Sequence, residues 1–116
     1  MIINMGLTPA IAGHSAGAPH SIATAGLIAM TKHIALEYRG KNIRANTLAL
    51  GNICTESTLH CMTVRERKNT VMENLMKMWG DPRQVEVARI AAIVASQQFA
   101  ITTGNTIAFN DGTVTL

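Results

Sequence analysis

The feature that most constrains this chain is a helix-forming segment, residues 19–38, whose first half is apolar on nearly every side. Pro19 suits a first helical turn, where its missing N–H removes no hydrogen bond, and Gly40 is a usual helix stop. The larger apolar residues are Ile22, Leu27, Ile28, Met30, Ile34 and Leu36, and alanine and glycine fill most of the gaps. Because a helix at a protein surface normally keeps one polar face, we expect this helix to be buried on two sides.

Short apolar segments flank this helix and predict strands. Residues 1–7 form an apolar run typical of a buried strand, and residues 43–50 form a second one. Residues 8–19 are rich in Gly, Ala, Ser and Pro and are expected to form a loop. Since termini are usually polar and frayed, a chain that starts within a core strand also leads us to expect that an upstream part is missing.

The second half of the chain carries stronger boundary signals. Thr63-Val-Arg-Glu66 forms a capping box, which predicts a helix to about Met78, and Asp81-Pro82 predicts the start of another helix. Residues 105–109 predict a last strand, followed by a turn at Asp111-Gly112. The order β-α-β-α-α-β, without an internal repeat, indicates one α/β domain over residues 1–116 with a parallel sheet.

Composition narrows the location and the partners. The 116 residues are 47% hydrophobic and only 15% charged, so we expect another subunit or domain to cover part of the surface. A net charge of +3 with 3% aromatic residues argues against nucleic-acid binding. No apolar run approaches the roughly 18 residues of a membrane span, and no signal peptide is evident. With two cysteines, too few for a disulfide framework, we expect a cytoplasmic protein with no membrane contact.

Two further groups of residues have a functional interpretation and a structural one. Cys54, His60 and Cys61 lack the spacing of a standard zinc site, so we expect no metal. An apolar stripe at helical spacing more often packs in the interior than lines a substrate pocket. That stripe comprises Met72, Leu75, Met76 and Trp79.

Five short motifs occur in one order along nearly all of the chain. They are residues 35–38 with 42–46, the loop 50–55, the helix start 79–82 with 87–88, Thr102-Thr103-Gly104, and Asn110-Asp111-Gly112. Together they resemble the C-terminal half of the short-chain dehydrogenase/reductase family, whose loop is Pro-Gly-x-x-x-Thr and whose helix start is Gly-x-Pro-x-x-Val-Ala. The closing motifs of that family are Ile-Thr-Gly and Asp-Gly-Gly. Each motif alone is weak, but five in register form a specific signal.

The resemblance implies a doubly wound Rossmann sheet, a nicotinamide cofactor (NAD or NADP), and hydride transfer to or from a carbonyl or alcohol. In the family, a Gly-x-x-x-Gly-x-Gly turn holds the cofactor pyrophosphate at a helix N-terminus. No such turn follows the first strand here. We therefore expect a partial Rossmann fold: the C-terminal half, with about three parallel strands and crossover helices, and without the N-terminal dinucleotide-binding half.

The catalytic positions implied by the resemblance are all substituted. His20 stands where the proton-donating Tyr is expected, Thr24 where the supporting Lys is expected, and Leu7 where the carbonyl-binding Ser is expected. Each change is reachable by one nucleotide substitution, which indicates recent loss of selection for catalysis or a scaffold retained for another role. A tolerated histidine at a helix start is favoured over His20 as a substitute acid. Thr8 is a poor replacement for the serine, because adjacent strand side chains face opposite ways.

Residual cofactor contacts and three hypotheses of function follow from the resemblance. Gly51, Ile53 and Thr55 would touch the nicotinamide end but would bind weakly alone, so we expect no cofactor for this chain by itself. The first hypothesis is an inactive fragment of an NAD(P)-dependent oxidoreductase. The second is a pseudoenzyme that docks on an intact family member, or forms a homo-oligomer, through the helix at 19–38 and the last strand. The third, an active split enzyme, is disfavoured by the substituted positions.

Overall fold

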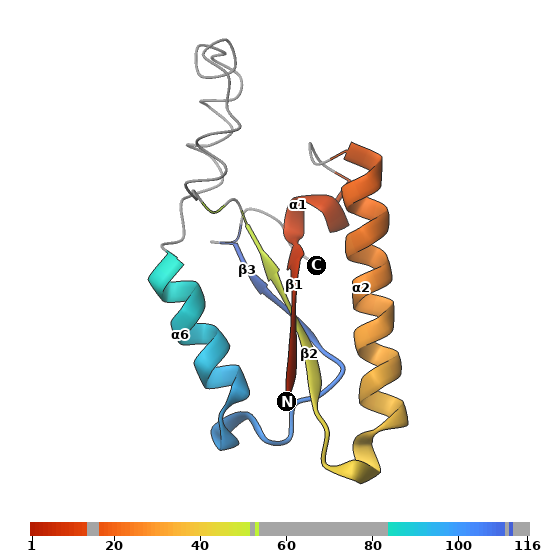
Figure 1. Cartoon of the computed structure of the whole chain (residues 1–116). Coiled ribbons are helices and arrows are strands. Elements are labelled where there is room, and N and C mark those ends of the chain that lie inside the picture. Colours follow the sequence, from red (N-terminus) through yellow and green to blue (C-terminus); the bar gives the residue numbers. More distant parts are fainter. Residues whose placement is uncertain (14–16, 52, 54–83, 111, 113–116) are drawn as a thin grey trace.

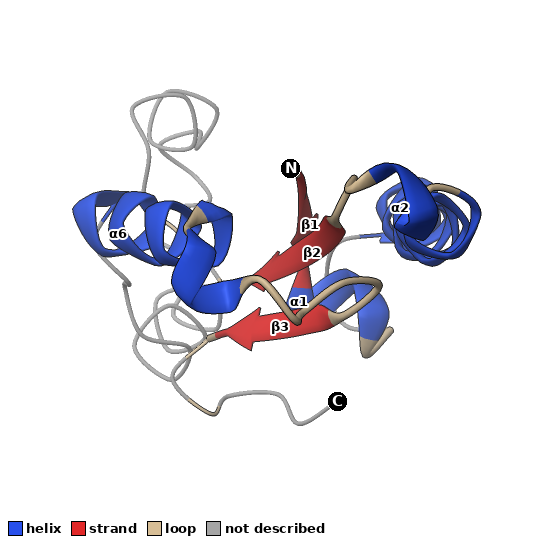
Figure 2. Ribbon diagram, turned by 90° about the horizontal axis from the view of Figure 1, so that it is seen from below, coloured by secondary structure: helices blue, strands red, loops and turns tan. Residues whose placement is uncertain are grey.

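The chain folds around a small parallel sheet with a helix layer on each side (Figure 1). The computed structural model describes residues 1–13, 17–51, 53, 84–110 and 112. Its strands are β1 (Ile2–Leu7), β2 (Ala45–Leu50) and β3 (Thr106–Phe109), in the order β1-β2-β3 with both pairs parallel. The long helices α2 (Gly17–Glu37) and α6 (Gln84–Ala95) lie on opposite sides of the strands, as Figure 2 shows. The predicted parallel α/β architecture is therefore confirmed.

The central strand β2 forms the core. Residues 45–49 are all buried, and Ala45, Leu48 and Ala49 are fully inaccessible. This follows from position, because β2 has a hydrogen-bonded neighbour on each edge and helices on both faces. On α6, Val87 and Val94 are buried and lie two helical turns apart on one face.

The prediction that β1 is a buried strand is wrong for the chain as described. Ile2 is 38% exposed and Met5 is 49% exposed. The reason is that β1 is an edge strand: it pairs only with β2, in register from Ile2 opposite Ala45 to Leu7 opposite Leu50. One row of its backbone groups therefore faces away from the described sheet.

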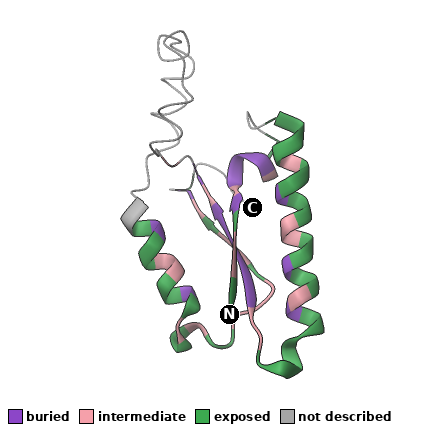
Figure 3. Ribbon diagram, viewed as in Figure 1, coloured by how far each residue is buried: buried purple, intermediate pink, exposed green. Residues whose placement is uncertain are grey.

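The prediction that α2 is buried on two sides is also wrong. Only its sheet-facing side is covered, where Thr24, Thr31 and Ala35 are buried (Figure 3). The larger side chains of the opposite side are open to solvent, with Ile22 at 73%, Leu36 at 69% and Met30 at 46% exposed. The helix therefore does not follow the ordinary amphipathic pattern: threonines lie on its covered face, some aliphatic residues are half-buried, and the largest exposures belong to aliphatic side chains.

The boundaries of α2 also differ from those expected. Residues 8–19 are not all loop: a short helix α1 (Thr8–Ile11) follows β1 directly, and α2 begins at Gly17, so that Pro19 lies within its first turn. At the other end Gly40 is not the left-handed residue. The 3₁₀ turn η1 (Arg39–Lys41) extends the helix, and Asn42 takes the left-handed conformation at φ 56°, which asparagine tolerates better than most residues.

The second half agrees with the sequence where it is described. Helix α6 and strand β3 lie where a helix and a last strand are predicted. The expected turn is present at Gly112, which has φ 73° and donates its N–H to Asn110 Oδ1 at 3.1 Å. The capping box at 63–66, its helix, and the start at Asp81-Pro82 lie outside the described residues. None of the described helices has both the length and the hydropathy to cross a membrane.

Arg44, just before β2, joins the two halves of the chain. Its guanidinium donates hydrogen bonds of 2.9–3.4 Å to five main-chain carbonyl oxygens, those of Val94, Ala95, Ser96, Phe99 and Thr102. These carbonyls belong to the C-terminal end of α6, to the 3₁₀ turn η2 (Gln97–Phe99), and to the segment leading to β3. A cation at this place also complements the negative end of the helix dipole.

Replacing Arg44→Ala is expected to lower the free energy of unfolding by about 2–3 kcal/mol, because charge-assisted hydrogen bonds to part-buried carbonyls are lost together. Chemical denaturation monitored by circular dichroism measures this. Arg89→Ala, an exposed arginine on α6, is the matched control and should stay within about 0.5 kcal/mol of the parent. Equal midpoints for the two variants would contradict the role assigned to Arg44.

Candidate active site

The candidate site lies at the carboxyl edge of the sheet. Leu7, Leu50 and Phe109 are register partners at the ends of β1, β2 and β3. In parallel α/β proteins, ligands bind outside this edge, where the loops leaving the strands meet the helices. The sequence-predicted positions 7, 20, 24, 51 and 53 all belong to segments that leave or face this edge.

Leu7 and Thr8 stand where β1 turns into α1. Leu7 is half-buried and is the residue that precedes the first turn of α1. Thr8 is fully buried, and its hydroxyl donates to the Ala49 carbonyl of β2 at 2.9 Å. That hydroxyl is therefore committed to the backbone, in agreement with the expectation that Thr8 does not replace the serine.

His20 and Thr24 lie one turn apart on α2 but in different environments. The side chain of His20 is exposed, and it forms no hydrogen bond or ion pair with a described residue. Thr24 is only 7% exposed. A methyl group added to Gly6 of β1 would lie 3.1 Å from Thr24 Cγ2, so the helix and the strand are in close contact at this point. The position expected to hold a lysine is thus filled by a short side chain packed on the strand.

A buried polar network fixes the position of α2 relative to strands β1 and β2. Thr31 Oγ1 donates to the Leu27 carbonyl at 2.8 Å and accepts from Asn4 Nδ2 of β1 at 2.8 Å. It also accepts from Thr47 Oγ1 of β2 at 2.9 Å. The hydroxyl therefore uses its donor and both acceptor sites, the arrangement that buried polar groups need. By linking α2 to two strands, the network fixes where positions 20 and 24 lie relative to Leu7.

The sequence analysis missed this network. Asn4 lies in an apolar run, and Thr31 was not treated separately from the apolar residues around it. A usable signal was the spacing of Thr24 and Thr31, which are seven residues apart and therefore lie on one helix face. Two polar residues at that spacing in an otherwise apolar helix indicate a polar buried contact.

The loop leaving β2 packs tightly against the chain leaving β3. Gly51 is buried, its N–H donates to the Phe109 carbonyl at 2.9 Å, and a Cβ at this position would lie 3.1 Å from the Asn110 backbone. Ile53 is half-buried, and Thr55, the third predicted nicotinamide-side residue, lies outside the described residues, as do Cys54, His60 and Cys61. Asn110 is 5% exposed and was not singled out from the sequence as a site residue.

A parallel sheet between two helix layers, with its loops gathered at the carboxyl edge, defines part of a Rossmann-type α/β protein. The family described as enoyl-(acyl carrier protein) reductase matches residues 1–114. Glucose 1-dehydrogenase 2 of Bacillus subtilis is 37% identical over 97 residues, which cover 84% of this chain. A 3-oxoacyl-[acyl-carrier-protein] reductase of Vibrio cholerae is 34% identical over 111 residues, which cover 96% of this chain. The chain belongs to the short-chain dehydrogenase/reductase family.

The chain spans less than half of the proteins it matches. The aligned region is 36% of the Bacillus protein and 44% of the Vibrio protein. The structure of a 4-hydroxyisoleucine dehydrogenase complexed with NADH superimposes with a TM-score of 0.80 at 20% identity, covering 97% of this chain and 46% of that one. The predicted partial Rossmann fold is therefore confirmed.

The contact between Gly6 and Thr24 makes a direct test of the site geometry. Gly6→Ala is expected to cost about 1–2 kcal/mol of folding free energy, because the new methyl group meets Thr24 Cγ2. In a Thr24→Ser background, which removes Cγ2, the same change should cost less than half as much. Gly26→Ala, on the open side of α2, is the control and should be neutral or stabilising. Equal costs of Gly6→Ala in both backgrounds would show that the two residues do not touch.

Proposed function

We propose that this chain is a degenerate portion of an NAD(P)-dependent short-chain dehydrogenase/reductase and catalyses no hydride transfer by itself. The observation that supports the proposal is the contrast between the formed secondary structure and the residues it carries. Strand β1 and helix α2 are formed, yet the positions where the resemblance predicts Ser, Tyr and Lys hold Leu7, His20 and Thr24.

The side chains at these positions do not supply the chemistry that carbonyl reduction requires. Leu7 has no polar atom to bind a carbonyl oxygen, and Thr24 has no charge to favour proton loss from a neighbouring acid. An imidazole at position 20 can transfer protons in principle. In this fold, however, no described residue orients His20, and a general acid must be held within hydrogen-bond reach of the reacting atom.

The residues of this chain also do not fit a tightly bound nicotinamide dinucleotide. The sequence contains no Gly-x-x-x-Gly-x-Gly turn to bind the pyrophosphate. At position 24, where the family places a lysine for the nicotinamide ribose, the threonine packs on Gly6. What remains is the loop containing Gly51, Ile53 and Thr55, whose contacts would reach only the nicotinamide end. We therefore assign no reaction step to a cofactor on this chain alone.

The proposal is tested by restoring chemistry and cofactor binding separately. The parent chain should show no micromolar NADH or NADPH binding by calorimetry. Leu7→Ser, His20→Tyr and Thr24→Lys together should leave it inactive. Fusing this triple variant to the upstream half of the Bacillus glucose 1-dehydrogenase 2 should produce NAD(P)-dependent turnover. The same fusion without the three changes is the control and should be at least 10³-fold slower, within the range of about 10²–10⁴ for losing a general acid.

A micromolar dissociation constant for the parent chain would overturn the cofactor part of this proposal. A folded fusion with the three changes that remains inactive would show that the catalytic positions have been assigned to the wrong residues.

A second function, a non-catalytic subunit that associates with another copy or with an intact family member, is favoured by the outer face of α2. Its aliphatic side chains Ile22, Met30 and Leu36 are 46–73% exposed. Exposed apolar surface of this kind commonly marks a protein interface. One edge of β1, which pairs with no strand in the described part of the chain, adds a second surface able to receive a partner.

The association hypothesis predicts a mass above the 12.4 kDa of one chain when light scattering follows size-exclusion chromatography at micromolar concentration. Ile22→Glu with Leu36→Glu should shift the protein toward monomer, because charges on the outer face of α2 oppose its burial. Ile101→Glu is the control, since Ile101 is 97% exposed and lies outside α2. A monomeric parent with a cooperative thermal transition would reject this hypothesis.

A further inference from the structure

We propose that the groove between α1 and α2 binds an amphiphilic carboxylate, an aliphatic chain ending in one carboxylate group, with Lys32 as the anion's partner. The inference goes beyond the proposed function and does not depend on it. The groove is lined by Ala10 and Ile11 of α1, by Gly13 in the turn after it, and by five residues of α2 between Ser21 and Lys32. Its volume is about 500 Å³, which falls within the usual size of small-molecule sites.

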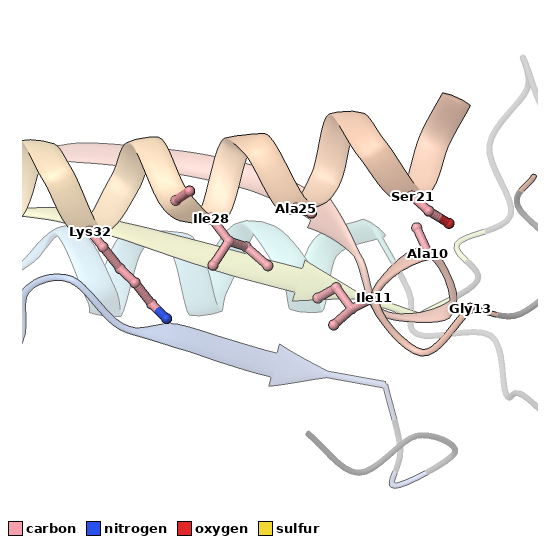
Figure 4. A pocket seen from close by; sticks show the side chains of 8 residues that line it. Ala10, Ile11, Gly13, Ser21, Ala25, Ile28 and Lys32 are labelled. Atoms are coloured by element: carbon pink, nitrogen blue, oxygen red, sulfur yellow. The ribbon is translucent and has the colours of Figure 1, made fainter. Parts of the chain in front are cut away.

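The walls of the groove are almost entirely aliphatic. In Figure 4, the side chains of Ile11 and Ile28 point toward one another, and Ala25 lies beside them on α2. The α2 residues of the groove recur at helical spacing, so they form a continuous strip next to the face that packs on the sheet. An aliphatic chain lying along this strip removes apolar surface from water on both sides of the contact.

The polar side chains that line the groove are found only at its two ends. Ser21 and Lys32 lie at opposite ends of the groove in Figure 4. They are eleven residues apart on α2, or roughly 16 Å at the rise of an α-helix. The groove thus matches an elongated ligand with one polar end. A compact polar ligand would leave the aliphatic walls unused.

The charges around the groove indicate which polar group of a ligand would be favoured at its Lys32 end. Lys32 forms no ion pair with a described residue, although its stem lines the groove. The described residues include five Lys and Arg, at positions 32, 39, 41, 44 and 89, but only two acidic residues, Glu37 and Glu86. This excess of positive charge attracts anions and disfavours cationic amphiphiles. A carboxylate at the Lys32 end therefore complements the groove better than a neutral or cationic group.

The proposal is tested with decanoate, below its micellar concentration, on the full chain labelled at isoleucine methyl groups. Saturable shifts of the Ile11 and Ile28 methyl signals are expected, while Ile22 and Ile101, which lie outside the groove, stay unchanged. Ala25→Phe should abolish the shifts by filling the groove, and Ala23→Phe, on the same helix but outside it, should not. Lys32→Gln should weaken decanoate binding about three- to fivefold, as expected for an exposed ion pair, whereas Lys41→Gln should not.

Neutral decanol separates charge recognition from simple partitioning. It is expected to bind the parent more weakly than decanoate and to be insensitive to Lys32→Gln. Equal affinity of decanol and decanoate for the parent would overturn the assignment of Lys32. Equal shifts at all four isoleucines would show non-specific adsorption. Contacts between the Ile11 or Ile28 methyl groups and a second copy, without a response to decanoate, would show that the chain itself occupies the groove and would also overturn the proposal.

Discussion

The contacts between the start of β2 and the segment after α6 determine how this chain folds as one unit. Residues about fifty positions apart in sequence meet there, and their contacts are mostly polar. Besides the Arg44 guanidinium, the buried Asn46 side chain donates to the Thr102 carbonyl and accepts from the Asn105 N–H. Thr103 Oγ1 accepts from the Ala45 N–H, and the Gly104 N–H donates to the Ala45 carbonyl at 2.7 Å. These contacts add to the β2–β3 ladder in aligning β3 beside β2.

Polar contacts also fix the position of α2, on the opposite side of the sheet from α6. An apolar helix resting on an apolar strand can slide or rotate at small cost, because dispersion and burial are not directional. The hydroxyl of Thr31 removes that freedom, since it is satisfied only when Asn4 and Thr47 are both in place. The two polar clusters therefore specify the register of the helix and of β3, while aliphatic packing supplies most of the burial. The outer face of α2 has no such contact among the described residues.

The architecture was predictable from the sequence because apolar segments of strand or helix length and the helix-start signal at Pro19 act locally. Burial was not predictable to the same degree. The apolar character of residues 1–7 and 20–30 indicates surfaces that can be covered, but it does not state what covers them. Among the described residues, one edge of β1 has no partner strand and one side of α2 is exposed. The predicted catalytic positions 7, 20 and 24 lie at the end of β1 and on α2, and their assignment to catalytic roles stays a prediction. The hydrogen bonds that join Thr8 to Ala49, and Thr31 to Asn4 and Thr47, depend on contacts across the fold. The spacing of Thr24 and Thr31 indicates a polar face on α2 but does not identify these partners.

The contact of Gly51 with Asn110 gives a family motif a structural role that does not depend on catalytic activity. A Cβ at position 51 would lie 3.1 Å from Cα and Cβ of Asn110, so a larger residue there would need the two loops to shift apart. The glycine of the loop motif therefore favours the close packing of these loops, whether or not a nicotinamide lies against it. The Thr102-Thr103-Gly104 motif likewise serves the alignment of β3. A protein descended from a short-chain dehydrogenase/reductase can lose its reacting groups and still keep motifs that the fold requires. Such motifs are therefore better evidence of ancestry and of folding constraints than of catalytic activity.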